Sequence, residues 1–281
     1  MSNRLTTFST ACLALLVWHG SMWAADEPVA APAAAAAKAP IILLKLDDLG
    51  SSSKDPRAGV SDRWQKVTDF LEEQKIKASY GIICESLALD QPAFIAWLKA
   101  RQDKGMIEFW NHGYYNAFKP ATGSTNNGQS GQFDGSTLEQ QREFLTHGQQ
   151  LFKEKMGNEM HSFGPHSGKI DATTYAALEA CPEITMVWFY GPPKGTTTSK
   201  FVFERTINLE VPIFNPNPED VKARYLKSGH SQAYIAMQGH PNQWDEAKLA
   251  AFKTTVTFLR EQGCTFMTAT EYLAAHPPAK Q

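Results

Sequence analysis

Short apolar runs alternate along the chain with longer segments in which apolar residues recur at helical spacing. Buried strands of a parallel sheet are nearly continuous apolar runs, whereas amphipathic helices repeat every three to four residues. The runs predict strands at 41–48, 78–84, 106–110, 160–163, 184–190, 233–238 and 265–269. The periodic segments predict helices at 62–74, 94–101, 138–156, 172–180 and 245–263, with Gly157 and Gly263 as helix stops.

Strands that alternate with helices in this way predict an α/β fold built on a parallel sheet, closed or nearly closed into a barrel. In such folds, ligands bind outside the carboxyl ends of the strands. A polar stretch at 119–136, rich in Gly, Asn and Ser, is too long for a simple connection. We expect it to be a lid or binding loop beside the site.

The first 40 residues do not follow the strand and helix pattern. Arg4, the apolar run at 11–18 and a cleavage site after Ala24 or Ala25 are typical of an export signal. Residues 26–40, rich in Ala and Pro, then predict a flexible linker. We therefore divide the chain into a signal peptide at 1–25, a linker at 26–40 and a catalytic domain at 41–281. The alternative is an amphipathic N-terminus that is not cleaved.

Composition and charge narrow the class of protein. Of the 281 residues, 42% are hydrophobic, which is enough for a sizeable core. A formal net charge of -2 does not favour nucleic acid or an anionic membrane as a partner. We expect an exported protein, periplasmic or secreted, without an integral membrane segment after signal cleavage. Cys84, Cys181 and Cys264 remain in the mature chain. This odd number allows at most one disulfide, and we favour buried free thiols.

Acids and histidines stand where the predicted strands end. Asp47 and Asp48 end the first strand, His112 follows the third with Asn116 beyond it, and His240 follows a late strand. A divalent metal prefers a carboxylate and imidazoles, with one position open. Asp48 and His112 suit that role, and Asn116 would add a weaker carbonyl oxygen. Asp47, which points the other way if the strand stays regular, would be the general base, and His240 the acid.

Each of these residues also has a structural interpretation. An acid pair after a strand often caps a helix or forms a turn. His240 with Pro241 is consistent with a simple turn, and His166 with a helix cap. The interpretation of these residues as one functional site depends on their convergence at one edge of the sheet.

These residues carry a resemblance to a known family. LKLDDLG, NHGYYN, FGPHSG and QGHPNQW occur in the order of the motifs of the polysaccharide deacetylase superfamily, the NodB-homology group similar to carbohydrate esterase family 4. The resemblance covers roughly 41–273 and implies a distorted (β/α) barrel of about seven parallel strands. It also implies zinc or another divalent ion, bound by Asp48, His112 and Asn116, with Asp47 as base and His240 as acid.

Two positions depart from the family pattern. Asn116 stands where the family has a second metal-binding histidine, and Gly164 stands where an arginine usually orients the base. Asp, His and Asn form a more oxygen-rich ligand set than Asp with two histidines. We therefore expect weaker metal binding and a less organised base. His166 could compensate if it reaches the site.

The resemblance leads to three hypotheses about function. The first is a metal-dependent hydrolase that removes acetyl groups from a glycan, in which Asp47 takes a proton from a metal-activated water. The second is a glycan-binding protein that has lost its metal and its activity, and the third is another carbohydrate-active hydrolase or lyase. We expect a polymeric or oligomeric carbohydrate to contact four further residues: Tyr114, Tyr115, His166 and Trp244. Trp110 we assign to the core.

Overall fold

The computed structural model describes residues 38–52, 58–117 and 131–278, which belong to one compact unit, Ala37–Gln281. The predicted signal peptide, nearly all of the predicted linker and most of the polar loop at 119–136 lie outside the described residues. Their predicted roles therefore stay predictions.

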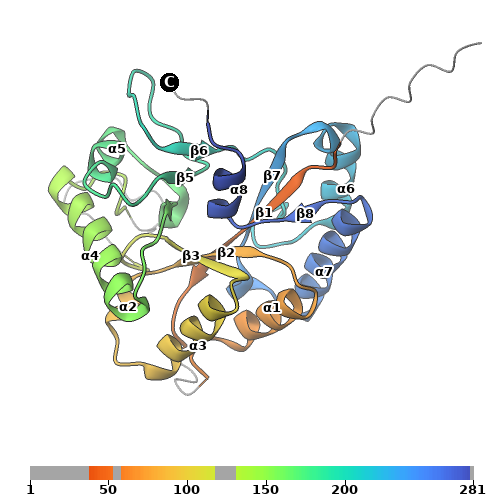
Figure 1. Ribbon diagram of the computed structural model, residues 1–281, viewed down its shortest axis with the longest axis horizontal. Helices are drawn as coiled ribbons and strands as arrows, with labels where there is room; N and C mark the ends of the chain where they lie inside the picture. Colours follow the sequence, from red (N-terminus) through yellow and green to blue (C-terminus); the bar gives the residue numbers. More distant parts are fainter. Residues whose placement is uncertain (1–37, 53–57, 118–130, 279–281) are drawn as a thin grey trace, which may run out of the picture. The chain divides into compact units, whose positions relative to one another are not determined.

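One parallel sheet forms the centre of the domain (Figure 1). Its strand order is β6-β5-β4-β3-β2-β1-β7, and β8 pairs with the start of β1. A parallel bridge from Arg205, just after β6, to Ala236 of β7 brings the two outer strands of the sheet together. The predicted distorted barrel is confirmed. The strands are β1 Ile41–Leu49, β2 Ala78–Ile82, β3 Ile107–Asn111, β4 Ser162–Phe163, β5 Met186–Trp188, β6 Phe201–Phe203, β7 Tyr234–Gly239 and β8 Thr265–Phe266.

Helices surround the curled sheet on its outside, and α8 lies against it near the C-terminus (Figure 1). Several begin at a side-chain cap, such as Thr137 before α4, which forms a reciprocal capping box with Gln140. The left-handed backbone of Gly157 ends α4, as the sequence predicts. The helices are α1 Asp62–Glu73, α2 Glu85–Ala88, α3 Pro92–Asp103, α4 Leu138–Met156, α5 Ala172–Leu178, α6 Pro218–Lys227, α7 Glu246–Glu261 and α8 Ala269–Ala275.

All seven predicted strands and all five predicted helices are present, with shifts at their ends. The sequence did not reveal β6, α2, α6 or α8. β6 has only three residues, too few for a periodic signal. α6 buries only Val221 and Tyr225, so its apolar face is narrow. The helix starts at the Asn217 side-chain cap, with a proline in its first turn.

The two faces of the sheet bury separate apolar clusters. The larger cluster lies between the outer face and the helices and includes Ile42, Leu44 and Leu46 of β1. The smaller one fills the barrel interior, where Trp188 and Phe203 stack at 4.7 Å. Ala269 and Tyr272 of α8 belong to the interior cluster. Because α8 packs near the start of β1, the apolar filling leaves the opposite, carboxyl end of the strands open for a site.

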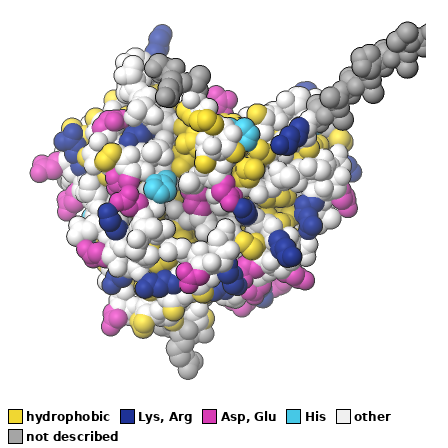
Figure 2. Space-filling view, viewed as in Figure 1, with side chains coloured by type: hydrophobic (Ala, Val, Ile, Leu, Met, Phe, Trp, Pro, Cys, Tyr) yellow, Lys and Arg dark blue, Asp and Glu magenta, His cyan; other side chains and the backbone are white. Residues whose placement is uncertain are grey.

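The predicted buried thiols are confirmed: Cys84, Cys181 and Cys264 are free and buried. Among the described residues, no helix is both long enough and apolar enough to cross a membrane. Figure 2 shows acidic and basic side chains interspersed over the face that it presents. This mixture agrees with the near-zero net charge of -2.

Candidate active site

The site is built from side chains that continue the inward-facing rows of the strands. Successive residues of a strand point to opposite faces, so residues two apart share a face. Leu43 of β1 lies in the barrel interior, and Lys45 and Asp47 follow it on the same side. In β3, interior Trp110 is followed by His112, and in β7, interior Ala236 is followed by Gln238. The rows therefore change from apolar to polar toward the strand ends.

An irregularity in β1 brings two adjacent acids to the same cavity. The pairing of β1 with β2 shifts register between Leu46 and Leu49, and Asp48 has a left-handed backbone with φ 67°. Such irregularities re-aim side chains, often beside active sites, and Asp tolerates the left-handed region better than most residues. Asp47 and Asp48 consequently both line the cavity. A regular strand would have turned one of them away.

Asp48 faces two histidines. Its Oδ1 lies 3.1 Å from Nε2 of His112 and 3.6 Å from Nε2 of His166. Burial opposes ionisation of Asp48, but the hydrogen bond to His112 and the charges of His112 and His166 outweigh it and hold the pKa of Asp48 well below its usual value. Burial and the nearby His112 lower the pKa of His166 to about 4. Around neutral pH, His166 therefore offers an uncharged imidazole.

The backbone and a tryptophan hold His112 in place. Its Nδ1 donates to the carbonyl oxygen of Gly164 at 2.7 Å, which leaves Nε2 directed at Asp48. Its ring packs against Trp110 with centroids 4.7 Å apart. A hydrogen bond from the far nitrogen to a carbonyl is the usual support of a metal-binding histidine. His112 is thus oriented as a ligand would be.

The donor set suits a divalent ion in its chemistry. Within the described ranges, no group of three or more His, Cys, Asp and Glu side chains is already arranged to hold a metal ion. However, ligand atoms about 2.1 Å from a tetrahedral ion lie roughly 3.4 Å from one another. The two distances from Asp48, 3.1 and 3.6 Å, lie on either side of that value. One carboxylate and two imidazoles therefore fit a divalent metal ion. His166 lacks the support that His112 has, because its far nitrogen, Nδ1, is buried without a hydrogen-bond partner among the described residues.

Asn116 lies at the edge of the same cavity. It is exposed, and its backbone N–H donates to Glu85 Oε1 at 2.8 Å. The Nε2 atoms of His112 and His166, in contrast, both lie within 4 Å of the Asp48 carboxylate. The structure thus brings His166, which we expected to contact substrate, into contact with the predicted metal ligands.

Asp47 is almost fully buried, with 1% of its surface exposed, and is held by two donors. Lys45 Nζ lies 2.5 Å from each carboxylate oxygen, and Gln238 Nε2 donates to Oδ2 at 2.6 Å. The Gln238 carbonyl oxygen accepts a hydrogen bond from Arg205, which fixes the orientation of the amide. A buried carboxylate is stable as an anion only when donors of this kind surround it. Asp47 is therefore kept ready to accept a proton.

His240 lies on another side of the cavity, with Nε2 3.9 Å from Asp47 Oδ2. Its Nδ1 donates to the buried Glu210 carboxylate at 2.6 Å. Glu210 also accepts from the backbone N–H groups of His240 and Phe214 and from the Trp244 indole. Burial disfavours the charged imidazole, but the Glu210 hydrogen bond and the charge of Asp47 outweigh it and raise the pKa of His240. His240 can therefore carry and donate a proton.

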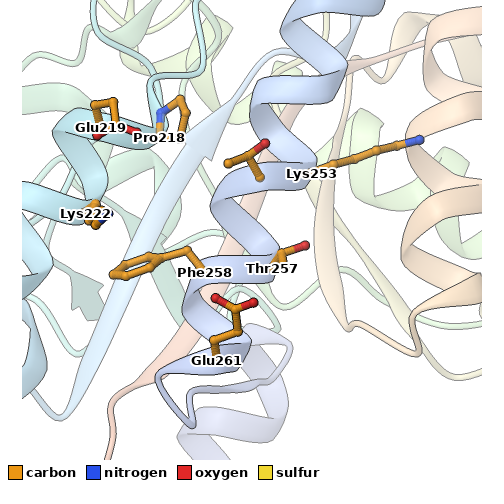
Figure 3. A pocket seen from close by; sticks show the side chains of 8 residues that line it. Pro218, Glu219, Lys222, Lys253, Thr257, Phe258 and Glu261 are labelled. Atoms are coloured by element: carbon orange, nitrogen blue, oxygen red, sulfur yellow. The ribbon is translucent and has the colours of Figure 1, made fainter.

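These groups surround a cavity of about 390 Å³ at the strand ends, which Pro165, Tyr190, Arg205, Ile213 and Phe214 also line. A second cavity of about 260 Å³ adjoins it and shares Arg205, Ile213, Gln238 and His240 with it. Figure 3 shows a separate groove of about 450 Å³ between α6 and α7, from which Lys253 points away toward α1. This larger groove has no histidine or aspartate in its lining, so we assign the chemistry to the cavity at the strand ends.

Three of the expected substrate contacts lie in packed surroundings instead. Tyr114 is buried and stacks on His147 of α4 at 4.7 Å. Tyr115 packs edge-on against Phe144 at 5.6 Å. Trp244 is 2% exposed and packs against Phe252. Trp110 lies in the core, as expected.

Four residues of the site escaped the sequence analysis: Lys45, Arg205, Glu210 and Gln238. Lys45 had a usable signal, because it is the one charged residue inside the run IILLKL and lies two positions before Asp47. Gln238 likewise lies two positions before His240. Arg205 and Glu210 follow the short strand β6 and have no comparable signal.

Comparison with solved structures supports the same architecture. A family 4 acetyl xylan esterase from Clostridium thermocellum, solved with a cobalt ion, has a TM-score of 0.56 at 15% identity, covering 84% of this chain and 91% of that one. The family 4 domain of a multidomain xylanase from the hindgut metagenome of Trinervitermes trinervoides has a TM-score of 0.57 at 15% identity, covering 85% of this chain and 91% of that one. The chain has the polysaccharide deacetylase fold.

A pseudoenzyme of carbohydrate esterase family 4 from Bacillus anthracis shares this fold. It has a TM-score of 0.54 at 14% identity, and the match covers 84% of this chain and 66% of the pseudoenzyme. No family model matches the sequence, and no curated protein does. The fold therefore occurs in active and in inactive proteins, so the residues of the cavity, and not the fold, determine whether a protein is active.

Proposed function

We propose that this protein is an exported, metal-dependent hydrolase that removes acetyl groups from a glycan. The observation that carries the proposal is the convergence on one cavity of three features: a base held by donors, Asp47; an acid whose pKa is raised, His240; and a donor set around Asp48. A protein that only binds glycans has no need for a base and an acid side by side in the lining of one cavity.

Asp48, His112 and His166 would hold the ion, with His166 supplying the imidazole that Asn116 does not. When bound, a divalent ion such as zinc would acidify a water molecule and polarise the acetyl carbonyl. Asp47 would accept the proton of the attacking water, since its carboxylate is held in place by Lys45 and Gln238. His240 would then protonate the departing sugar oxygen or nitrogen.

The neighbours in fold support a carbohydrate substrate. Two of them are named for xylan or xylanase, and another is a peptidoglycan N-acetylglucosamine deacetylase. A polymer with acetyl groups on oxygen or nitrogen is thus the substrate class to test first. The sequence pattern of residues 1–25 adds export, which places the protein where such polymers occur.

The experiment is a measurement of acetate release from acetylated xylan, acetylated chitooligosaccharides and peptidoglycan, with and without a chelator. We expect release from at least one substrate, its loss with chelator and its return with a divalent ion. Asp47→Asn is the control for release that does not depend on the site. Stoichiometric metal without acetate release from any of these substrates would contradict the proposal.

One observation favours a second function, a glycan-binding protein without activity. The pseudoenzyme with the same fold demonstrates that members can lack activity, and Asn116 replaces an expected ligand here. This alternative predicts a protein that binds glycans but contains no ion after purification in metal-replete buffer. The metal content of the purified protein distinguishes the two functions.

A further inference from the structure

Lys45 is a charged residue in an unusual place. It lies in the middle of β1, with about 1% of its surface exposed, directly above the apolar filling of the barrel. Its ammonium group lies 4.5 Å from the centre of the Trp110 ring and 5.4 Å from that of Phe189. Burying an ammonium group costs several kcal/mol unless an anion and aromatic faces offset it. A buried lysine at this position therefore needs an explanation.

The contacts of Lys45 indicate that its role is to hold Asp47. Nζ lies 2.5 Å from both Oδ1 and Oδ2 of Asp47, and no other carboxylate among the described residues lies within 4 Å of it. Because the two residues are separated by one position in the strand, the pleat directs both to the same side. Gln238 adds a neutral donor to Oδ2 only. Burial lowers the pKa of Lys45, and the charge and hydrogen bonds of Asp47 oppose this shift. In its ammonium form, Lys45 places a positive charge beside the proposed base.

The space around Gly164 explains why a lysine of β1 can fill this role. A Cβ added to Gly164 would lie 3.3 Å from Cε of Lys45 and 3.0 Å from the Trp110 ring. Trp188 Cβ lies 3.3 Å from the same position, and the backbone of Gly164 has no positive φ, so a side chain there is opposed by its neighbours and not by the backbone. The aliphatic chain of Lys45 therefore occupies the space that a side chain at position 164, just after β4, would need to approach Asp47.

We propose that Lys45 is the positioning residue for Asp47 and takes the part that a cation extending from position 164 would otherwise play. It fixes the orientation of the Asp47 carboxylate and balances its charge, so that the carboxylate is held in place to accept a proton from the attacking water. This inference rests on the proposed hydrolase function. With Lys45 in this role, the base is better organised than the sequence analysis led us to expect.

Lys45→Met tests the inference, because methionine fills similar space without a charge or a strong donor. We expect kcat to fall on the order of 10²-fold, the scale of general-base catalysis, with KM and bound metal unchanged. Lys200→Met is the matched control, since Lys200 is a buried lysine whose Nζ donates to the Cys181 carbonyl far from the cavity. If Lys45→Met does not fold, Lys45→Gln serves in its place, with the same expected loss.

A rescue experiment separates positioning from mere packing. Gly164→Arg in the wild-type chain should lower activity, because Lys45 and Trp110 occupy the space for its side chain. In a Lys45→Ala background the same change should raise kcat at least about tenfold, because general-base assistance is regained when the new cation reaches Asp47. If the double variant folds and binds metal but is no faster than Lys45→Ala, the proposal is overturned.

The outcomes distinguish a failure of the proposed Lys45 role from a failure of the proposed hydrolase function. An active wild type together with a metal-loaded Lys45→Met variant of equal kcat overturns the role of Lys45 and leaves the hydrolase function intact. A wild type that releases no acetate from any probe overturns the hydrolase function and this inference with it. Loss in Lys45→Met with retained activity in Lys200→Met supports both.

Discussion

At the scale of single residues, neighbouring Asp47 and Asp48 have separate tasks. Asp48 lies nearest His112, at 3.1 Å, whereas Asp47 is held by Lys45 and Gln238 and lies 3.6 Å from His112 Nε2. Asp48→Ala or His112→Ala should therefore remove the metal and the activity together. Asp47→Asn should keep the metal and lose on the order of 10²-fold or more in rate. Metal analysis beside acetate release checks this, and metal loss in Asp47→Asn would mean that the acids share one role.

His166 and Asn116 offer a direct comparison of two candidate ligands. The imidazole of His166 lies 3.6 Å from Asp48 Oδ1, whereas Asn116 is exposed at the rim. His166→Ala should weaken zinc binding by more than the roughly 10- to 100-fold that loss of an outer-shell partner costs. Asn116→Ala, as the matched variant, should leave zinc affinity unchanged. Isothermal titration decides, and the reverse order of effects would return Asn116 to the ligand set.

The pH dependence should report His240. As an acid, His240 acts in its protonated form, so activity should be lost as the pH rises through its raised pKa. Glu210→Gln removes the negative charge that favours the imidazolium ion and so lowers this pKa. The alkaline limb of the kcat/KM profile should then move to lower pH. A limb that stays in place in Glu210→Gln would assign it to another group.

At the scale of elements, the end of β1 determines the site. The register shift between Leu46 and Leu49 and the left-handed Asp48 direct two successive side chains into one cavity. Asn242 stabilises this turn, because its side-chain amide donates to the Asp48 carbonyl oxygen at 2.8 Å. The loop after β7 thus holds the loop after β1, and the ends of two neighbouring strands form one unit.

Gly81 of β2 makes room for Trp110, which supports both Lys45 and His112. A Cβ at Gly81 would lie within 2.6 Å of Trp110 Cη2, closer than real Cβ contacts allow. Gly81→Ala should lower the free energy of unfolding by about 1–3 kcal/mol and reduce activity, since the indole must move. Gly191→Ala is the control, because nothing lies within 4 Å of its Cβ position. Equal denaturation midpoints for the two variants would contradict this account.

At the scale of the whole molecule, the domain should fold without its first 37 residues. β1 begins at Ile41, whose N–H donates to the Ala233 carbonyl oxygen, and it pairs with β2, β7 and β8. A chain from Lys38 to Gln281 should therefore unfold at the same temperature as the full chain and bind the same metal. A chain that starts at Leu46 lacks half of this central strand and should not fold. Differential scanning calorimetry of both chains checks the prediction.

The sequence by itself was sufficient for the α/β class, the strand ends and six residues that line the cavity: Asp47, Asp48, His112, Asn116, His166 and His240. Short continuous apolar runs that alternate with helical segments indicate buried strands, and parallel strands gather their carboxyl ends at one edge. Asp47, Asp48, His112 and His240 follow from that rule. The rule is local to each strand, so it does not depend on how the barrel closes.

The tertiary structure alone decided which side chains touch. Period-two alternation turns Asp48 away from Asp47, and only the irregular end of β1 brings both to one cavity. Lys45 could be placed beside Asp47 only once the strand was known to remain regular there, with Gly164 of a distant segment leaving space. Glu210 reaches His240 across 30 positions of the chain. Such contacts depend on how strands and loops pack in three dimensions, which the period of the hydrophobic pattern does not encode.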